Sequence, residues 1–283
     1  MAPKVTVLGL GIMGSAITRR LVDAGLSTTV WNRSAGRAAA FEEVARVADG
    51  PDAAVAEADI VLTMLFDADA VRSVMTTALS AMRPGAIWLQ CSTVGVAAAR
   101  EFAELAAAAG VRFLDAPVLG TKAPAESGTL TVLLAGGDDA ASEVAPVLAA
   151  ISSRTVRAGD AAPAGSALKL AMNAWIATIT AGIAQSLTIA DRLGLEPRLV
   201  LEALQGQAAD SPYAQVKGGA MLARSFAAQF EVAGLLKDVR LARDAVPALP
   251  QALLAALEEL YADAADAGAG REDIAAVWCA FQS

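Results

Sequence analysis

A glycine-rich turn between a predicted strand and a predicted helix constrains the fold of this chain more than any other feature. Residues 4–8 form a short β-branched run that is typical of a buried strand, and a helical stretch covers residues 15–24. Between them lies the pattern G-x-G-x-x-G, formed by Gly9, Leu10, Gly11, Ile12, Met13 and Gly14. In this setting the first glycine permits a tight turn, the second lets the backbone approach a pyrophosphate, and the third allows helix and strand to pack closely. The pattern therefore predicts a dinucleotide-binding turn at a helix N-terminus, with these six residues as its contacts.

The segment after the next predicted strand, residues 28–31, bears on which dinucleotide is bound. It reads Asn32-Arg33-Ser34, whereas a site that prefers NAD usually carries Asp or Glu here for the ribose hydroxyls. A guanidinium and a hydroxyl suit a 2′-phosphate, which arginine can bind in bidentate fashion. We therefore expect these three residues to contact the cofactor, and NADP(H) to be preferred over NAD.

Strands and helices continue to alternate through the first half of the chain. Further strands are predicted at residues 59–65, 86–90, 112–114 and 129–135, with helices between several of them. Such alternation predicts a mostly parallel, doubly wound sheet of the Rossmann type, whose ligands bind beyond the carboxyl ends of the strands. The residues at those ends are additional candidate cofactor contacts, namely Met64, Leu65, Phe66 and Thr93.

The second half of the chain has a different character. After residues 153–154 no further strand is predicted, and helical stretches follow one another from residue 163 to residue 281. We therefore expect an α/β architecture of two domains: residues 1–160 form the NADP-binding domain and residues 161–283 an all-α domain for substrate binding and dimerisation. A long interdomain helix, predicted over residues 163–193, opens the second domain.

Two polar residues stand out in that long, apolar helix. Lys169 and Asn173 are four residues apart, so they lie on one face. Burial of a lysine is costly unless it has a partner or a task. The alternative is an ammonium that reaches water along its aliphatic stem.

Composition excludes several function classes. The formal net charge is −8 and the chain has no histidine, which disfavours a nucleic-acid surface and removes histidine-based catalysis and metal binding. Two distant cysteines and no visible signal peptide favour a cytoplasmic protein. Polar residues interrupt the long helix, so we interpret it as a core or interface helix rather than a membrane span. We expect no metal site and neither a nucleic-acid nor a membrane partner.

Four motifs in order carry a resemblance to a known family. They are GLGIMG at 9–14, DAPVLGTKAPAESGTL at 115–130, GSALKLAMN at 165–173 and KDVRLA at 237–242. This set resembles the β-hydroxyacid dehydrogenases, which include 3-hydroxyisobutyrate dehydrogenases and glyoxylate/succinic semialdehyde reductases, and the resemblance spans essentially the whole chain. The segment 121–125 looks like the glyoxylate/succinic semialdehyde reductase branch.

The resemblance implies an NAD(P)-dependent oxidoreductase that moves hydride between the nicotinamide and a small β- or γ-hydroxy acid or aldehyde acid. Lys169 matches the family's general acid/base, Asn173 its substrate-binding asparagine, and Lys237 a lysine near the nicotinamide and substrate. The candidate substrate contacts are Leu119, Gly120, Thr121, Lys122, Lys169, Asn173, Phe230, Lys237 and Asp238.

Departures from the family leave alternatives open. Leu119 stands where the family often has serine, so substrate identity is in doubt. An imine reductase on the same fold and a non-catalytic NADP-binding oligomeric scaffold are the alternatives, although Lys169 argues against both. Because the long helix is apolar nearly all round, we expect an exposed patch at Trp175, Ile179 and Ile183 on a monomer. This predicts a homodimer or a homotetramer.

Overall fold

A computed structural model describes residues 2–282 of the chain. Its residues form two compact units, which divide between Lys169 and Leu170. The division falls inside one helix, α9 (Ala164–Arg192), so the first turn and a half of that helix belong to the first unit.

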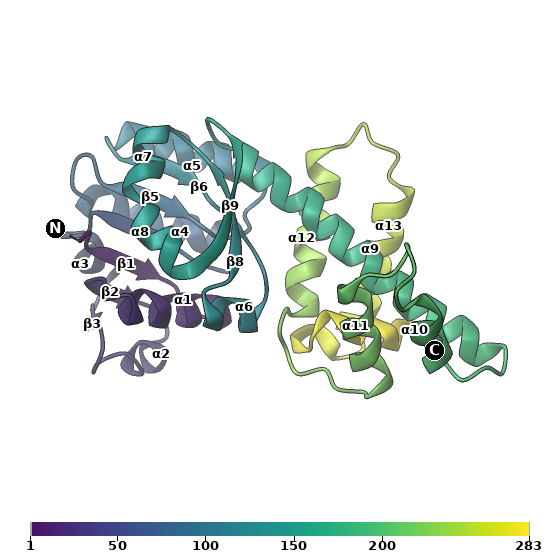
Figure 1. The fold of residues 1–283 in the computed structure, drawn as a ribbon. Helices are drawn as coiled ribbons and strands as arrows, with labels where there is room; N and C mark the ends of the chain where they lie inside the picture. Colours follow the sequence, from purple (N-terminus) through teal and green to yellow (C-terminus); the bar gives the residue numbers. More distant parts are fainter. Residues whose placement is uncertain (1, 283) are drawn as a thin grey trace. The chain divides into compact units, whose positions relative to one another are not determined.

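The first unit is built on one sheet with helices on both faces (Figure 1). Its strands are β1 (Val5–Leu8), β2 (Thr28–Trp31), β3 (Arg46–Val47), β4 (Ile60–Thr63), β5 (Ile87–Gln90), β6 (Arg112–Asp115), β7 (Val118–Leu119), β8 (Leu130–Ala135) and β9 (Ser152–Gly159). They lie in the order β3-β2-β1-β4-β5-β6-β8-β7, with β9 paired to β8. The first six strands pair in parallel, and β8 runs antiparallel to β6 and β7. This confirms the predicted doubly wound sheet, with strand order reversing at β1 and β4.

Strand β9 contradicts the expectation that strands cease near residue 153. It pairs in parallel with β8 from Ser152 to Gly159. The sequence pattern did not indicate it because its residues are half-buried or exposed, so it lacks the apolar run of a central strand. The two-residue strands β3 and β7 are too short for any periodicity.

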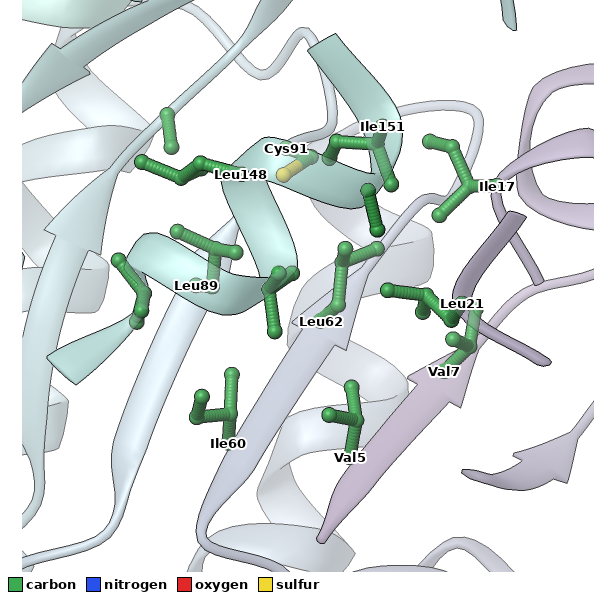
Figure 2. Close-up of a cluster of buried hydrophobic side chains, with 14 of the residues drawn as sticks. Val5, Val7, Ile17, Leu21, Ile60, Leu62, Leu89, Cys91, Leu148 and Ile151 are labelled. Atoms are coloured by element: carbon green, nitrogen blue, oxygen red, sulfur yellow. The ribbon is translucent and has the colours of Figure 1, made fainter. Parts of the chain in front are cut away.

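Two apolar layers hold the helices to the sheet. The helices of the first unit are α1 (Ile12–Asp23), α2 (Ala35–Ala39), α3 (Pro51–Val55), α4 (Ala68–Ala78), η1 (Leu79–Ala81), α5 (Val96–Ala108), α6 (Lys122–Ser127), α7 (Asp138–Glu143) and α8 (Ala145–Ile151). On one face Val7 of β1 and Leu62 of β4 lie in a cluster with Ile17 of α1 and Ile151 of α8 (Figure 2). The other face is covered by α3, α4 and α5. Burial on both faces explains why β1, β4 and β5 have no exposed residue.

As predicted, the described residues of the second unit form helices joined by loops, with an isolated β-bridge between Glu231 and Asp273. The unit contains the rest of α9, then α10 (Arg198–Leu204), α11 (Pro212–Leu222), α12 (Val232–Ala245), α13 (Ala252–Asp266), η2 (Ala269–Arg271) and η3 (Ile274–Phe281). Its core includes Leu235, Tyr261 and Ile274, all fully buried. The final segment is a 3₁₀ helix that Asp273 caps by accepting a hydrogen bond from the Ala275 N–H.

Helix α9 differs from its predicted form in two details. Pro163 precedes the helix and its carbonyl accepts the first helical hydrogen bond, from the Ala167 N–H at 2.8 Å. The predicted apolar patch is wrong at Ile183, which is only 4% exposed because other helices of its unit cover it, whereas Trp175 is 59% exposed. Ile179 is half-buried. By length and composition alone α9 could cross a membrane, a property that it shares with core helices of water-soluble proteins.

Candidate active site

The glycine turn has the geometry that its pattern predicts. Gly9 has φ +106°, and a Cβ there would lie 2.4 Å from the Met64 carbonyl oxygen. A Cβ on Gly14 would lie 1.9 Å from the Gly9 carbonyl oxygen, so only glycine lets α1 pack this closely on the turn. At Gly11 a Cβ would meet nothing within 4 Å, which leaves this side of the turn open to a ligand.

The N-terminus of α1 supplies what a phosphate needs. Gly11 is the N-cap and has no side chain to cap the helix, so the N–H groups of the first turn, including those of Ile12 and Met13, have no intrahelical acceptor. The positive end of the helix dipole adds to this potential. The turn therefore fits the pyrophosphate of a dinucleotide.

The segment after β2 is tied to the glycine turn by one side chain. The Leu10 N–H donates to Asn32 Oδ1 at 3.0 Å, and Asn32 Nδ2 donates to the Ser34 carbonyl at 3.1 Å. Asn32 therefore fixes the shape of this segment, while the side chains of Arg33 and Ser34 are exposed to solvent. Ser34 is the N-cap of α2 but makes no side-chain cap hydrogen bond. Arg33 and Ser34 thus expose their side chains on a fixed backbone.

The residues after β4 and β5 lie at the carboxyl edge of the sheet, as predicted. Met64 packs beneath the glycine turn, since its backbone and Cβ are the atoms that a larger residue at Gly9 or Gly14 would meet. Leu65 is half-buried, Phe66 is 54% exposed and Thr93 is half-buried. In doubly wound sheets this edge is where the nicotinamide half of a dinucleotide binds.

A buried polar network, which was not predicted from the sequence, fixes that edge. Gln90 Oε1 accepts hydrogen bonds from Thr63 Oγ1 at 3.0 Å and from the Ser92 N–H at 2.8 Å. Gln90 Nε2 donates to the Ser92 carbonyl at 2.8 Å, and Ser92 Oγ accepts from the Leu65 N–H at 2.9 Å. The ends of β4 and β5 are therefore joined by side chains just before the predicted cofactor contacts. The polar residues at two neighbouring strand ends were the available signal.

Lys169 is buried in the first unit. It is 8% exposed, and Nζ donates to the carbonyl oxygen of Val118 at 2.8 Å. The ammonium therefore does not extend to bulk water, and the alternative interpretation of a surface lysine is not what the structure shows. A buried amine held by a backbone carbonyl is the kind of group that can donate or accept a proton in a reaction.

The second unit holds a chain of three polar side chains. Asn173 is fully buried, and its Nδ2 donates to Asp238 Oδ2 at 2.5 Å. Lys237 Nζ donates to Asp238 Oδ1 at 2.6 Å. Among residues 2–282, no hydrogen-bond partner is found for the buried Asn173 Oδ1. A buried acceptor without a partner is costly, so a donor from a water molecule or a ligand would stabilise it.

The other candidate substrate contacts fall into both units. Leu119 ends β7, and Gly120 follows with φ +122°, where a Cβ would lie 2.7 Å from Leu130 Cδ2. Thr121 is the N-cap of α6 and makes no side-chain cap hydrogen bond, while Lys122 is exposed with its Nζ 3.8 Å from a Glu126 oxygen. Within the first unit, Leu119 and Gly120 directly follow Val118, which binds Lys169.

Phe230 is placed by its backbone in the second unit. Its N–H donates to Asp273 Oδ2 at 3.3 Å, and its ring packs on Gly234, where a Cβ would lie 3.0 Å from the ring. Phe230 thus lies at the entry of α12, the helix that carries Lys237 and Asp238.

Metal binding and thiol catalysis are two other chemistries for which the described side chains offer little support. Residues 2–282 contain no group of three or more His, Cys, Asp or Glu side chains that could hold a metal ion. Cys91 is buried, and desolvation, with a smaller contribution from the Asp115 charge, raises the pKa of its thiol far above the ordinary value. A thiol in that state is not a nucleophile.

Comparison with known proteins places both units in one group. The family profile of the NAD binding domain of 6-phosphogluconate dehydrogenase matches residues 4–159, and the profile described as NAD-binding of NADP-dependent 3-hydroxyisobutyrate dehydrogenase matches residues 163–280. Glyoxylate/succinic semialdehyde reductase 2, chloroplastic, of Arabidopsis thaliana is 30% identical over 276 residues, which cover 95% of this chain and 77% of the reductase.

Two comparisons with proteins of Mycobacterium tuberculosis point to the same family. A probable 3-hydroxyisobutyrate dehydrogenase of Mycobacterium tuberculosis is 33% identical over 253 residues, covering 86% of this chain and 85% of that protein. The solved structure of the 3-hydroxyisobutyrate dehydrogenase of Mycobacterium tuberculosis with L-serine superposes with a TM-score of 0.90 at 29% identity and covers 100% of both chains.

Proposed function

This chain belongs to the β-hydroxyacid dehydrogenase family of NAD(P)-binding oxidoreductases, and we propose that it uses NADP(H) to interconvert a small β- or γ-hydroxy acid and its carbonyl form. The substrate would be of the glyoxylate, succinic semialdehyde or 3-hydroxyisobutyrate type. The observation that carries the proposal is the buried ammonium of Lys169, held by the Val118 carbonyl. The names of the two relatives, a glyoxylate/succinic semialdehyde reductase and a probable 3-hydroxyisobutyrate dehydrogenase, support the substrate class.

Lys169 is the proposed general acid. A bound nicotinamide supplies or accepts hydride, and reduction of a carbonyl builds negative charge on its oxygen. A fixed ammonium stabilises that charge most effectively where water is excluded, and Lys169 is 8% exposed. Lys169 then donates a proton to the oxygen, and in the direction of alcohol oxidation its neutral amine removes the hydroxyl proton.

Asn173 is proposed to orient the substrate. It lies four residues beyond Lys169 in α9, which places the two side chains on the same face of that helix. Asp238 accepts the hydrogen bond from Asn173 Nδ2 and so determines which way the amide faces. Oδ1 is then available to accept a hydrogen bond from a substrate hydroxyl. Lys237, bound to the other oxygen of Asp238, would add positive charge beside an anionic substrate or the nicotinamide.

The turn after β7 is proposed to bind the substrate carboxylate. Gly120 and Thr121 offer backbone N–H groups, and the Thr121 hydroxyl is not used to cap α6. Leu119 cannot donate a hydrogen bond, so the carboxylate would depend on Thr121 and the backbone. A cation at Lys122 lies next in the chain and is exposed.

The preference for NADP(H) over NAD is proposed from Arg33 and Ser34. Both side chains are exposed after β2, on a backbone that Asn32 holds against the glycine turn. No carboxylate stands at Asn32, Arg33 or Ser34 to bind the ribose hydroxyls or to repel a 2′-phosphate.

A cytoplasmic homodimer or homotetramer is the proposed assembly. In the second unit α9 exposes Trp175 at 59% and Ile189 at 53%, which are large apolar side chains for a solvent-facing surface. An interface over such a helix is expected to be large and apolar, as in obligate dimers.

The decisive experiment combines Lys169→Met with a substrate panel. Methionine keeps most of the lysine stem in its buried site and removes only the charge and the proton. Turnover of NADPH with short aldehyde acids should fall by about 10²–10⁴-fold in kcat. The Kd for NADPH, measured by fluorescence titration, should change by less than about twofold.

Lys4→Met is the matched control, since Lys4 is an exposed lysine paired with Glu57. It should keep wild-type kcat. A Lys169→Met enzyme with most of its kcat would contradict the assignment. Turnover of a cyclic imine in place of every aldehyde acid would favour the imine reductase alternative, and NADPH binding without any turnover would favour the scaffold.

A further inference from the structure

A single short segment of the first unit contacts the start of α9 at two places. Asp115, at the end of β6, accepts hydrogen bonds from the Ser166 N–H and the Ser166 hydroxyl, both at 2.7 Å. Three residues later the Val118 carbonyl accepts the hydrogen bond from Lys169 Nζ at 2.8 Å. In both pairs the partners are 51 residues apart, so a step of three residues along the segment matches a step of three residues along the helix.

Asp115 is not explained by the proposed chemistry. It is fully buried, and burial raises its pKa, while hydrogen bonds from Ser166 and the Gly165 backbone act in the opposite direction. All of these donors belong to the first turn of α9. The carboxylate therefore acts as an N-cap supplied from another element, and the helix dipole favours a negative charge at this end.

The strand side of this contact is held by the sheet. The Ala116 N–H donates to the Gln90 carbonyl at 2.8 Å, and the Leu133 N–H donates to the Pro117 carbonyl at 2.8 Å. The segment between Asp115 and Val118 therefore has backbone hydrogen bonds to β5 on one side and β8 on the other. It is therefore a rigid platform for the first turn of α9.

The helix side of the contact has no room to shift. A Cβ on Gly165 would lie 2.6 Å from the Asp115 carbonyl oxygen and 2.6 Å from the Leu133 carbonyl oxygen. Backbone atoms cannot swing aside as a flexible side chain can. The first turn of α9 thus rests directly on β6 and β8.

We propose that Asp115 and Ser166 are positioning residues for Lys169: they lock the first turn of α9 on the sheet and thereby determine where the ammonium lies. This proposal rests on the function proposed for Lys169. A lysine side chain has four rotatable bonds, so its amine is placed only if both its backbone and its Nζ partner are fixed. The segment from Asp115 to Val118 fixes both, and pre-organisation of this kind is what lets one group stabilise developing charge.

Two variants disturb the contact in different ways. Ser166→Ala removes one hydrogen bond and leaves the Ser166 N–H on Asp115, so the fold is retained. Gly165→Ala keeps both hydrogen-bonding partners but pushes the helix away from the strand. Each should lower kcat by about 10- to 100-fold, the range expected for a displacement of about 1 Å. The Kd for NADPH should be unchanged, because the glycine turn is untouched.

The same helix provides matched controls. A Cβ on Gly182 would meet nothing within 4 Å among the described residues, and the exposed Ser186 hydroxyl donates to the Gly182 carbonyl of its own helix. Gly182→Ala and Ser186→Ala should keep wild-type kcat. Loss of activity in Gly165→Ala or Ser166→Ala with none in the controls would show that the position of the substitution matters, rather than the helix or the residue type.

A double-mutant cycle separates positioning from general stability. If Ser166 acts through Lys169, Ser166→Ala should lower kcat in the wild type but have no further effect in Lys169→Met. An equal fold-loss in both backgrounds would overturn the proposal. So would a Ser166→Ala enzyme that matches Ser186→Ala.

A chemical readout keeps this test apart from the test of the proposed function. Pulse labelling with an amine-reactive reagent, followed by peptide mass spectrometry, reports the reactivity of Lys169, with the buried Lys217 as internal reference. Labelling of Lys169 relative to Lys217 should rise in Gly165→Ala and Ser166→Ala if its amine is released. Unchanged labelling would overturn the positioning role even if Lys169 is catalytic, whereas full activity of Lys169→Met would overturn only the proposed function.

Discussion

Lys217 and Asp273 form a buried ion pair in the second unit, and its removal gives a strong test of how that unit is held together. Lys217 Nζ lies 2.6 Å from Asp273 Oδ1, with side-chain exposures of 6% and 5%. Asp273 also accepts hydrogen bonds from the N–H groups of Gln229, Phe230 and Ala275. It therefore joins α11, the segment before α12 and the start of η3.

Replacement of Lys217 by methionine would leave the Asp273 charge buried without its cation. Breaking a buried pair from one side costs about 3–5 kcal/mol, because the remaining charge keeps its desolvation penalty. The long methionine side chain fills much of the space of the lysine stem, so the loss would come from the charge rather than from a cavity. We expect the free energy of unfolding to fall by that amount.

Urea unfolding followed by circular dichroism measures this loss. With a slope of about 3 kcal/mol per M, the unfolding midpoint of Lys217→Met should fall by about 1–2 M. Adding Asp273→Asn should restore part of the stability, because the amide oxygen still accepts backbone hydrogen bonds and no charge is left buried. A loss below about 1 kcal/mol, as for an exposed pair, would refute the reasoning. Additive losses in the double variant would refute it as well.

Further expected outcomes concern the cofactor site, a titrating group and the assembly. Arg33→Ala should raise the KM for NADPH at least about tenfold more than the KM for NADH, since a bidentate phosphate contact is lost; equal changes would contradict the preference. Gln90→Leu should lower the free energy of unfolding by about 1–3 kcal/mol for each buried group left unpaired, and should raise the Kd for NADPH in fluorescence titration; an unchanged melting temperature would show that the network is dispensable. Burial raises the pKa of Asp115, so the folded state takes up its proton at higher pH than the unfolded state, and stability from this group is lost as pH rises through the folded pKa. Relative to Asp115→Asn, the wild type should therefore gain unfolding free energy in urea titrations as pH is lowered from 7 towards 4, and the opposite trend would refute the assigned direction. Sedimentation at low micromolar concentration should show a dimer or tetramer that Trp175→Asp weakens, whereas a single active monomer would refute the assembly.

Features that depend only on residues close together in the chain could be predicted from the sequence. The glycine turn is one such feature, because steric constraints within a single strand–turn–helix unit favour its three glycines. In the structure, a Cβ at Gly14 would lie 1.9 Å from the Gly9 carbonyl oxygen. The alternation of strands and helices was another, since strands buried on both faces must be apolar throughout. The position of Lys169 and Asn173 on one helix face followed from their spacing alone, and both lie in one continuous helix.

The partners of those residues could not be predicted, because the chain brings them together only when it packs. Asp115 meets Ser166 across 51 residues, Thr63 meets Gln90 across 27, and Lys217 meets Asp273 across 56. No local pattern marks such a pair, since hydrogen bonds between distant residues depend on the geometry of the whole sheet or helix layer. The sequence therefore marked Lys169 as unusual, and the tertiary structure supplied the reason its ammonium can be held.

Which residues are buried also depends on packing between distant parts of the chain. An apolar helix can be recognised in the sequence, but which of its faces is covered depends on neighbours elsewhere in the chain, so Ile183 is buried while Trp175 on the same helix is 59% exposed. Strand β9 was missed for the converse reason: it lies at an edge of the sheet, where backbone pairing with β8 holds it and no apolar run is required. Local sequence thus determined the elements and the reactive residue types, whereas long-range packing determined which polar groups meet and which apolar surfaces remain uncovered.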